Sequence, residues 1–143
     1  MEYFVSKQTG RSFVLRLDQG DLVLESIERL IQDAGIQNGV VVSGIGTVDA
    51  SVLHMVTSTG YPPVEFFDRK ESEPIEVVSI QGFIADGTPH LHMMISDKDA
   101  ALGGHLEHGC KTLYLAEIVI TEYLDLSVRR VPDEKSINKL TGI

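Results

Sequence analysis

The chain has 143 residues, of which 43% are hydrophobic and 23% are charged, a composition that excludes a largely disordered protein. Its formal net charge is −9, so DNA would repel it at long range, and no apolar stretch approaches the roughly 20 residues that span a bilayer. Cys110 is the single cysteine, which excludes an intrachain disulfide. With no secretory signal at the start, we expect a cytoplasmic protein.

The first two elements are read from hydrophobic periodicity. Apolar residues alternate over 11–17, which predicts a half-buried strand. Apolar residues at helical spacing over 23–34 then predict an amphipathic helix. We expect Asp21 to cap its start and Gly35, in a left-handed conformation, to end it.

The remainder of the chain is typical of strands. We expect strands at 40–48 and 51–57, separated by a turn at Asp49, and then a loop or irregular edge up to Pro74. Two further strands, 75–85 and 89–96, flank Asp86-Gly87-Thr88, which is a hairpin signal. A loop is expected at 97–109, and the longest strand at 112–124.

These elements favour one α+β domain covering residues 1–143. We expect a mostly antiparallel sheet, one main amphipathic helix and short flanking helices. The core of the domain is predicted at about 11–130. The tail at 131–143 is polar and is predicted to be partly disordered.

Three histidines are the candidate metal ligands. His90 and His92 are two residues apart on a predicted strand, so their side chains leave the same face. His105 follows Gly103-Gly104, whose missing side chains let the backbone approach the sheet closely. Three imidazoles with one open position are an arrangement known for catalytic zinc and related divalent metals. The alternative is that these histidines are hydrogen-bonded residues on a polar sheet face.

Three other residues are candidates for a supporting role near the histidines. Glu117 places a carboxylate on an otherwise apolar strand, where it would orient a histidine or lie at a subunit interface. Glu76 has the same two interpretations. His108 is a further candidate ligand, with a solvent-exposed position as its alternative. Nothing in the sequence places His54 at the site, and Cys110 is expected to be a buried structural residue.

Four segments occur here in an order that resembles a known family: Gly20-Asp21 before the helix, Ser43-Gly44-Ile45-Gly46-Thr47, His90-Leu91-His92 and Gly103-Gly104-His105-Leu106. Together they are similar to the plant and prokaryote conserved (PPC) domain, which occurs alone in bacteria and archaea and beside AT-hooks in plant nuclear proteins. The resemblance runs from about Arg11 to Arg130.

The resemblance implies a PPC-like fold, a homotrimer, and a metal or ligand site at subunit boundaries built from His90, His92 and His105. In plant members a Gly-Arg-Phe-Glu-Ile-Leu segment serves interaction with transcription factors. The matching stretch here, Glu73-Pro74-Ile75-Glu76-Val77-Val78, lacks the glycine, the arginine and the phenylalanine. No AT-hook occurs in the chain, so the family's DNA-binding label would apply only by analogy.

Three functional hypotheses follow. The first is a homotrimeric binding or regulatory module that contacts a protein partner or a small ligand and carries a divalent metal, with zinc expected. The second is a metal-dependent enzyme of unknown substrate that uses an open three-histidine site. The third is direct binding to DNA, which the charge of −9 disfavours. We favour the first, because no general base is identifiable from spacing.

Overall fold

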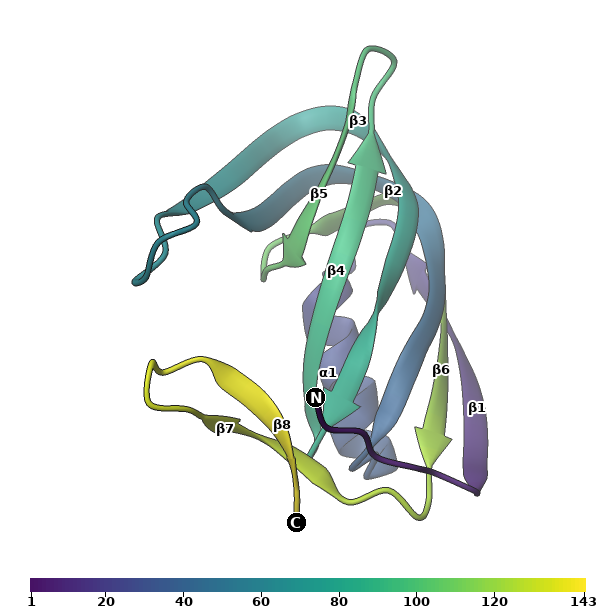
Figure 1. Ribbon diagram of the computed structural model, residues 1–143. Coiled ribbons are helices and arrows are strands. Elements are labelled where there is room, and N and C mark those ends of the chain that lie inside the picture. The colour runs from purple at the N-terminus through teal and green to yellow at the C-terminus, as the bar shows by residue number, and fades with distance from the viewer.

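The computed structural model describes residues 1–143, which form one six-stranded antiparallel sheet, one helix and one separate hairpin (Figure 1). The sheet contains β1 (Thr9–Asp18), β2 (Gly39–Val56), β3 (Glu65–Ala85), β4 (Thr88–Ser96), β5 (Ala101–Leu106) and β6 (Lys111–Tyr123). The helix is α1 (Val23–Ala34), and the hairpin consists of β7 (Val128–Pro132) and β8 (Asn138–Gly142). The antiparallel sheet and the main helix were predicted. The short flanking helices were not found, because α1 is the only helix, so α+β describes the fold only roughly.

The last strand in the order of the sheet folds back to pair with a strand near its middle. The order is β1-β6-β2-β3-β4-β5, and β5 pairs a second time with the distal part of β2. Strands β2 and β3 have 18 and 21 residues, and their distal parts bend away together as an arm (Figure 1). The core is packed between the sheet and α1, where Ile27 of the helix is fully buried in the same cluster as Ile118 and Ile120 of β6. Burying side chains of this size supplies the main stabilising free energy of the fold.

The ends of α1 follow local chemistry only in part. Gly35 ends the helix with φ of 68°, in the left-handed conformation predicted for it. The prediction for Asp21 is wrong. The N-cap residue is Leu22, and the Asp21 carboxylate instead accepts a hydrogen bond from the Asp18 backbone N–H at 2.9 Å.

No helix in the protein has the length and hydropathy required to cross a membrane.

Two predicted breaks in the chain are strands in the structure. The two predicted strands at 40–48 and 51–57 form one continuous strand, β2 (Gly39–Val56), because the interruption at Asp49 is only a register irregularity between Val48 and Ala50. The predicted loop before Pro74 is mostly strand, since β3 begins at Glu65 and pairs with the distal half of β2.

Two further segments are also more ordered than their composition predicts. Within the predicted loop at 97–109, strand β5 forms because it pairs with both β4 and β2. The polar tail pairs as β7 and β8 rather than being disordered. The Arg130 guanidinium fixes this hairpin to the sheet by donating to the carbonyl oxygens of Thr88 at 3.0 Å and Phe83 at 3.1 Å.

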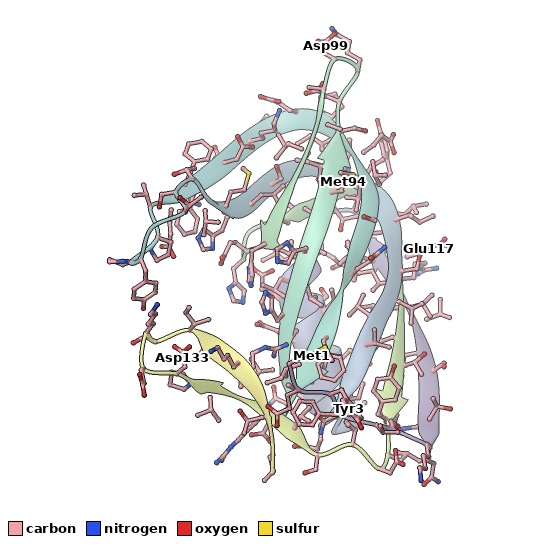
Figure 2. The ribbon with its side chains drawn as sticks, viewed as in Figure 1. Met1, Tyr3, Met94, Asp99, Glu117 and Asp133 are labelled. Carbon is pink, nitrogen blue, oxygen red and sulfur yellow. The ribbon has the colours of Figure 1, made fainter.

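One surface of the sheet exposes an apolar patch. Its members are exposed side chains on five strands, and each has a buried or half-buried neighbour in its own strand: Val14, Ile45, Val78, Met94 and Leu115. Glu117 lies among them as the register partner of both Arg16 and Ile45. Figure 2 labels Met94 and Glu117 on this part of the molecule.

A candidate metal centre of clustered histidines

Three histidine rings from β4 and β5 lie together. The ring centroids of His90 and His92 are 5.5 Å apart, and His105 lies 4.9 Å from His90 and 5.6 Å from His92. His92 and His105 are direct register partners across the two strands. The alternate residues of β4, Leu91 and Met93, are each 1% exposed, so the predicted division into a histidine face and a core face is confirmed.

Local sequence explains why these strands meet with the histidines on one face. Asp86 and Gly87 both have positive φ, at 50° and 71°, which is the conformation of a tight hairpin turn between β3 and β4. Gly104 lets β5 approach β2, because a Cβ atom there would lie 2.7 Å from the carbonyl oxygen of His54. The close approach predicted for the Gly-Gly pair is therefore present, and it presents His105 to the other rings.

The spacing of the three rings fits one metal ion. Tetrahedral zinc binds imidazole nitrogen at about 2.0–2.1 Å, which puts the centroids of two ligating rings roughly 5 Å apart. The observed separations of 4.9–5.6 Å bracket that value. His90, His92 and His105 together could thus hold a divalent cation and leave a fourth position open.

The protonation of two of these rings also suits metal binding. Burial lowers the pKa of His90, with the charges of His105, Arg130 and His92 acting in the same direction. Burial likewise lowers the pKa of His92, assisted by His105 and His54. Both imidazoles are therefore biased toward the neutral form at neutral pH, and only the neutral form has a lone pair for a metal.

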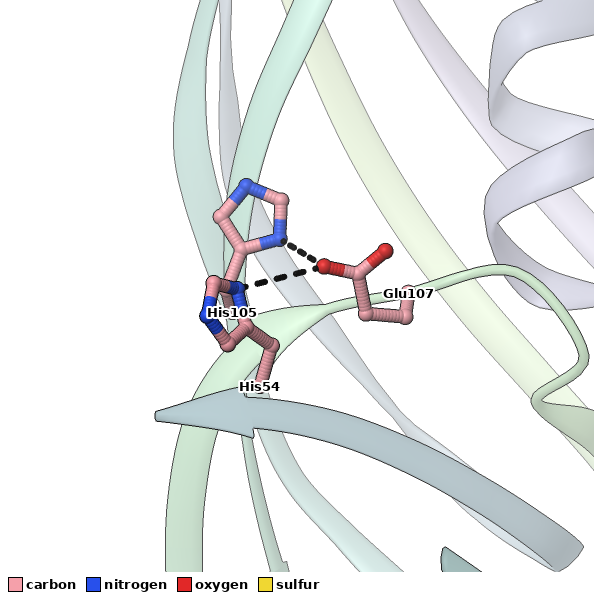
Figure 3. Close-up of side chains that lie close together, drawn as sticks. All are labelled: His54, His105 and Glu107. Carbon is pink, nitrogen blue, oxygen red and sulfur yellow. Dashed lines mark ion pairs between the residues drawn. The ribbon is translucent and has the colours of Figure 1, made fainter. Parts of the chain in front are cut away.

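His54 and Glu107 join the cluster from outside the predicted set (Figure 3). Glu107 Oε1 lies 3.3 Å from His105 Nδ1 and 3.5 Å from His54 Nδ1, and one ligand atom from each residue falls within 4.8 Å of the others. His54 is the register partner of His105 across β2 and β5. Sequence reasoning placed neither residue at the site, because residues 97–109 were expected to be a loop, which would not pair with β2.

The two groups of residues meet the geometric requirements differently. The ring centroids of His90, His92 and His105 fit one ion, whereas the ligand atoms already gathered within 4.8 Å belong to His54, His105 and Glu107. Turning an imidazole by 180° about χ2 exchanges its nitrogen and carbon positions while the ring stays in place. Ring positions therefore define the group of His90 and His92, whereas atom distances define the group in which the Glu107 carboxylate already faces the rings.

The three supporting candidates do not lie with the histidines. Glu117 is on β6, which β2 and β3 separate from β4. Glu76 is the register partner of Ser96 and lines a separate cavity of about 570 Å³. His108 Nε2 forms a 2.8 Å hydrogen bond with Glu28 Oε2 of α1, and this bond raises the pKa of His108. Their proposed roles stay predictions without geometric support in a single chain.

A cavity of about 380 Å³ opens beside the cluster. It is lined by His54, Met55, Val56, His92, Gly103, Gly104 and His105. His54 and His105 are 21% and 33% exposed at their side chains, so a small ligand could reach the rings from solvent. The site can therefore combine an ion with a second molecule.

Comparison with known proteins gives a family match. The family model of the Plants and Prokaryotes Conserved (PCC) domain, also written PPC, matches residues 4–124. The bifunctional protein GlmU of Synechococcus sp. (strain JA-2-3B'a(2-13)) is 30% identical over 122 residues, which are 85% of this chain and 18% of that protein. GlmU of Synechococcus sp. (strain JA-3-3Ab) is 30% identical over 86% of this chain and 19% of that protein. The chain thus spans less than a fifth of the length of these curated relatives.

Solved structures share the fold. A plant- and prokaryote-conserved protein of Pyrococcus horikoshii superposes with a TM-score of 0.79 at 21% identity, covering 100% of this chain and 99% of the other. A metal-containing protein of Archaeoglobus fulgidus gives 0.78 at 24% identity and 95% of both chains. A Bacteroides thetaiotaomicron protein, described as a candidate DNA-binding protein, gives 0.75 at 17% identity and 96% of both.

Proposed function

Because the chain belongs to the Plants and Prokaryotes Conserved (PCC) domain family, we propose that it is a self-associating module that holds a divalent metal ion on His90, His92 and His105. The observation that carries the proposal is the spacing of these three rings, whose centroids lie 4.9–5.6 Å apart. Zinc is the ion we expect, since neutral imidazoles in a tetrahedral arrangement suit it. A bound ion would supply an electrophilic position for an oxygen or nitrogen atom of a small ligand or of a partner protein.

Self-association is supported by the apolar patch. Val14, Ile45, Val78, Met94 and Leu115 expose apolar surface on one sheet, and contiguous exposed patches of this kind mark interaction surfaces. We propose that a second and a third copy of this chain cover the patch in a homotrimer. Glu117, which lies within the patch, supplies a carboxylate for contacts between copies.

DNA is not the partner that the surface favours. The net charge is −9. Seven of the twelve basic residues already pair with carboxylates of the same chain: Arg11, Arg16, Arg29, Lys70, Lys98, Lys111 and Lys139. Arg130 is occupied by backbone carbonyls. Binding to duplex DNA requires several free cations along one face.

Metal content tests the proposed function directly. We would measure zinc, nickel, copper and iron per chain in tag-free protein, for the wild type and for the double variant His90→Ala/His92→Ala. We expect at least one metal ion per chain in the wild type and one ion fewer per chain in the variant. A metal-free wild type that takes up no added zinc would contradict the proposal and leave the histidines as a polar sheet face.

A further inference from the structure

We infer that His54, His105 and Glu107 form a second divalent-cation position, joined to the three-histidine centre through the His105 ring. This inference deepens the proposed function, and it rests on that function only for the occupancy of the first position. The feature that carries it is a carboxylate oxygen that faces two imidazole nitrogens at once (Figure 3). The second position would take a cation that accepts mixed nitrogen and oxygen ligands, such as zinc.

The distances fit metal ligation better than hydrogen bonding. Two ligand atoms of a tetrahedral ion, each about 2.1 Å from it, are separated by roughly 3.4 Å. Glu107 Oε1 lies 3.3 Å from His105 Nδ1 and 3.5 Å from His54 Nδ1, whereas hydrogen bonds to oxygen usually span about 2.7–3.2 Å. His105 Nδ1 is moreover buried and has no hydrogen-bond partner. An ion between the three atoms would satisfy it.

The neighbours of His54 orient its ring toward Glu107. The ring stacks on Phe67 with centroids 4.6 Å apart and an interplanar angle of 8°. Its Nε2 atom faces Glu65 Oε1 at 3.5 Å. Its Nδ1 atom faces Glu107 Oε1 at the same distance. In the tautomer that carries its proton on Nε2, Nδ1 has a free lone pair on the side of Glu107. A carboxylate beside the outer nitrogen is a common feature of metal-binding histidines.

His105 can serve both positions because an imidazole has two nitrogens. Nδ1 faces Glu107 and His54, which leaves Nε2 for the centre formed with His90 and His92. With an ion at each position, His105 would bind through both nitrogens and would release its N–H proton to solvent. The cavity of about 380 Å³ that His54, His92 and His105 line gives small ligands access to this region.

The test is the number of zinc ions bound per chain. Protein stripped with a chelator would be titrated with zinc in competition with a chromophoric chelator. We expect two equivalents for the wild type and one for Glu107→Gln. The second equivalent should be at least about 100-fold weaker in that variant, because even outer-shell replacements cost 10–100-fold in affinity. His54→Phe keeps the stacked ring on Phe67 and removes both nitrogens, so it should also bind one equivalent. Glu28→Gln is the matched control and should bind two.

The variants separate this inference from the proposed function. Suppose the wild type binds one equivalent, which is lost in His90→Ala/His92→Ala and kept in Glu107→Gln. That result would overturn the second position and support the first. If instead the one equivalent is lost in Glu107→Gln and in His54→Phe but kept in His90→Ala/His92→Ala, the result would support the second position and overturn the first. A single equivalent lost in every variant would mean one merged centre and would overturn the inference. No binding at all would overturn both.

Discussion

His54 and His105 are direct register partners across β2 and β5, although about fifty residues separate them in the sequence. Their ring centroids lie 6.0 Å apart because β5 pairs with β4 on one side and with the distal part of β2 on the other. One short strand therefore gathers histidines from both neighbouring strands.

The close approach of β5 to β2 should depend on the residue at 104. In Gly104→Ala the new Cβ would meet the His54 carbonyl oxygen, so we expect the metal-free protein to lose about 1–3 kcal/mol of unfolding free energy. Zinc affinity should also fall, since His105 moves with the strand. Denaturant titration and a zinc competition assay measure the two effects. Gly60→Ala is the control, because nothing lies within 4 Å of a Cβ there. Equal behaviour of the two variants would contradict this account.

The pair of His108 and Glu28 should make stability depend on pH. Its hydrogen bond raises the pKa of His108 above 6.5, so the charged form is favoured in the folded state. The stabilisation is complete below pH 6.5 and is lost as the pH rises through the raised folded-state value. Both side chains are largely exposed, so we expect a difference of about 0.5 kcal/mol between wild type and His108→Gln at pH 5.5 and none at pH 8.5. Unfolding titrations at fixed protein concentration measure it, and a difference that grows with pH would refute it.

Cys110 should be chemically inert in the folded protein. Burial raises the pKa of its thiol from 9.0 to about 11, and its Sγ accepts a hydrogen bond from the Val52 backbone N–H at 3.2 Å. The raised pKa alone reduces the thiolate population near neutral pH about 100-fold. A thiol reagent should therefore react at least 100-fold more slowly with native protein than with protein unfolded in guanidinium. Comparable rates in the two states would show that the side chain is accessible.

The apolar patch should control assembly. In Ile45→Asp an unpaired carboxylate would be buried between copies, which opposes association strongly. We expect light scattering to give about three times the 15.7 kDa chain mass for the wild type and the mass of one chain for the variant. Val5→Asp introduces the same charge at an exposed residue outside the patch and should keep the wild-type mass. A monomeric wild type would contradict the proposed trimer. An unchanged mass for Ile45→Asp would show that the apolar patch does not form the interface between copies.

Elements defined by local chemistry could be predicted from the sequence. The periodicity of α1, the left-handed Gly35 and the turn at Asp86-Gly87 each depend on residues within a few positions of one another. The histidine pair on β4 belongs to the same group, since alternation along a strand fixes its face. These features were therefore predicted at the right positions.

Features that depend on pairing between strands far apart in the chain could not be predicted from the sequence. Strand β5 and the distal part of β3 contain turn-forming or polar residues and are strands because β2 and β4 supply hydrogen-bond partners. The ligand group of His54, His105 and Glu107 requires the register between β2 and β5, which no local pattern encodes. Asp21 was misassigned because its carboxylate had an alternative donor in the Asp18 backbone.

The contact between the C-terminal hairpin and the β3–β4 turn has a consequence for the charges around the histidines. Arg130 lies outside the matched residues 4–124, and its charge reaches His90 strongly enough to lower the pKa of that ring, although burial contributes more. A protein of net charge −9 thereby keeps a fixed cation beside its histidine cluster. The hairpin thus brings a positive charge to the same histidine cluster that the carboxylates of Glu65 and Glu107 face from strand β3 and from the end of β5, so charges of both signs surround the rings.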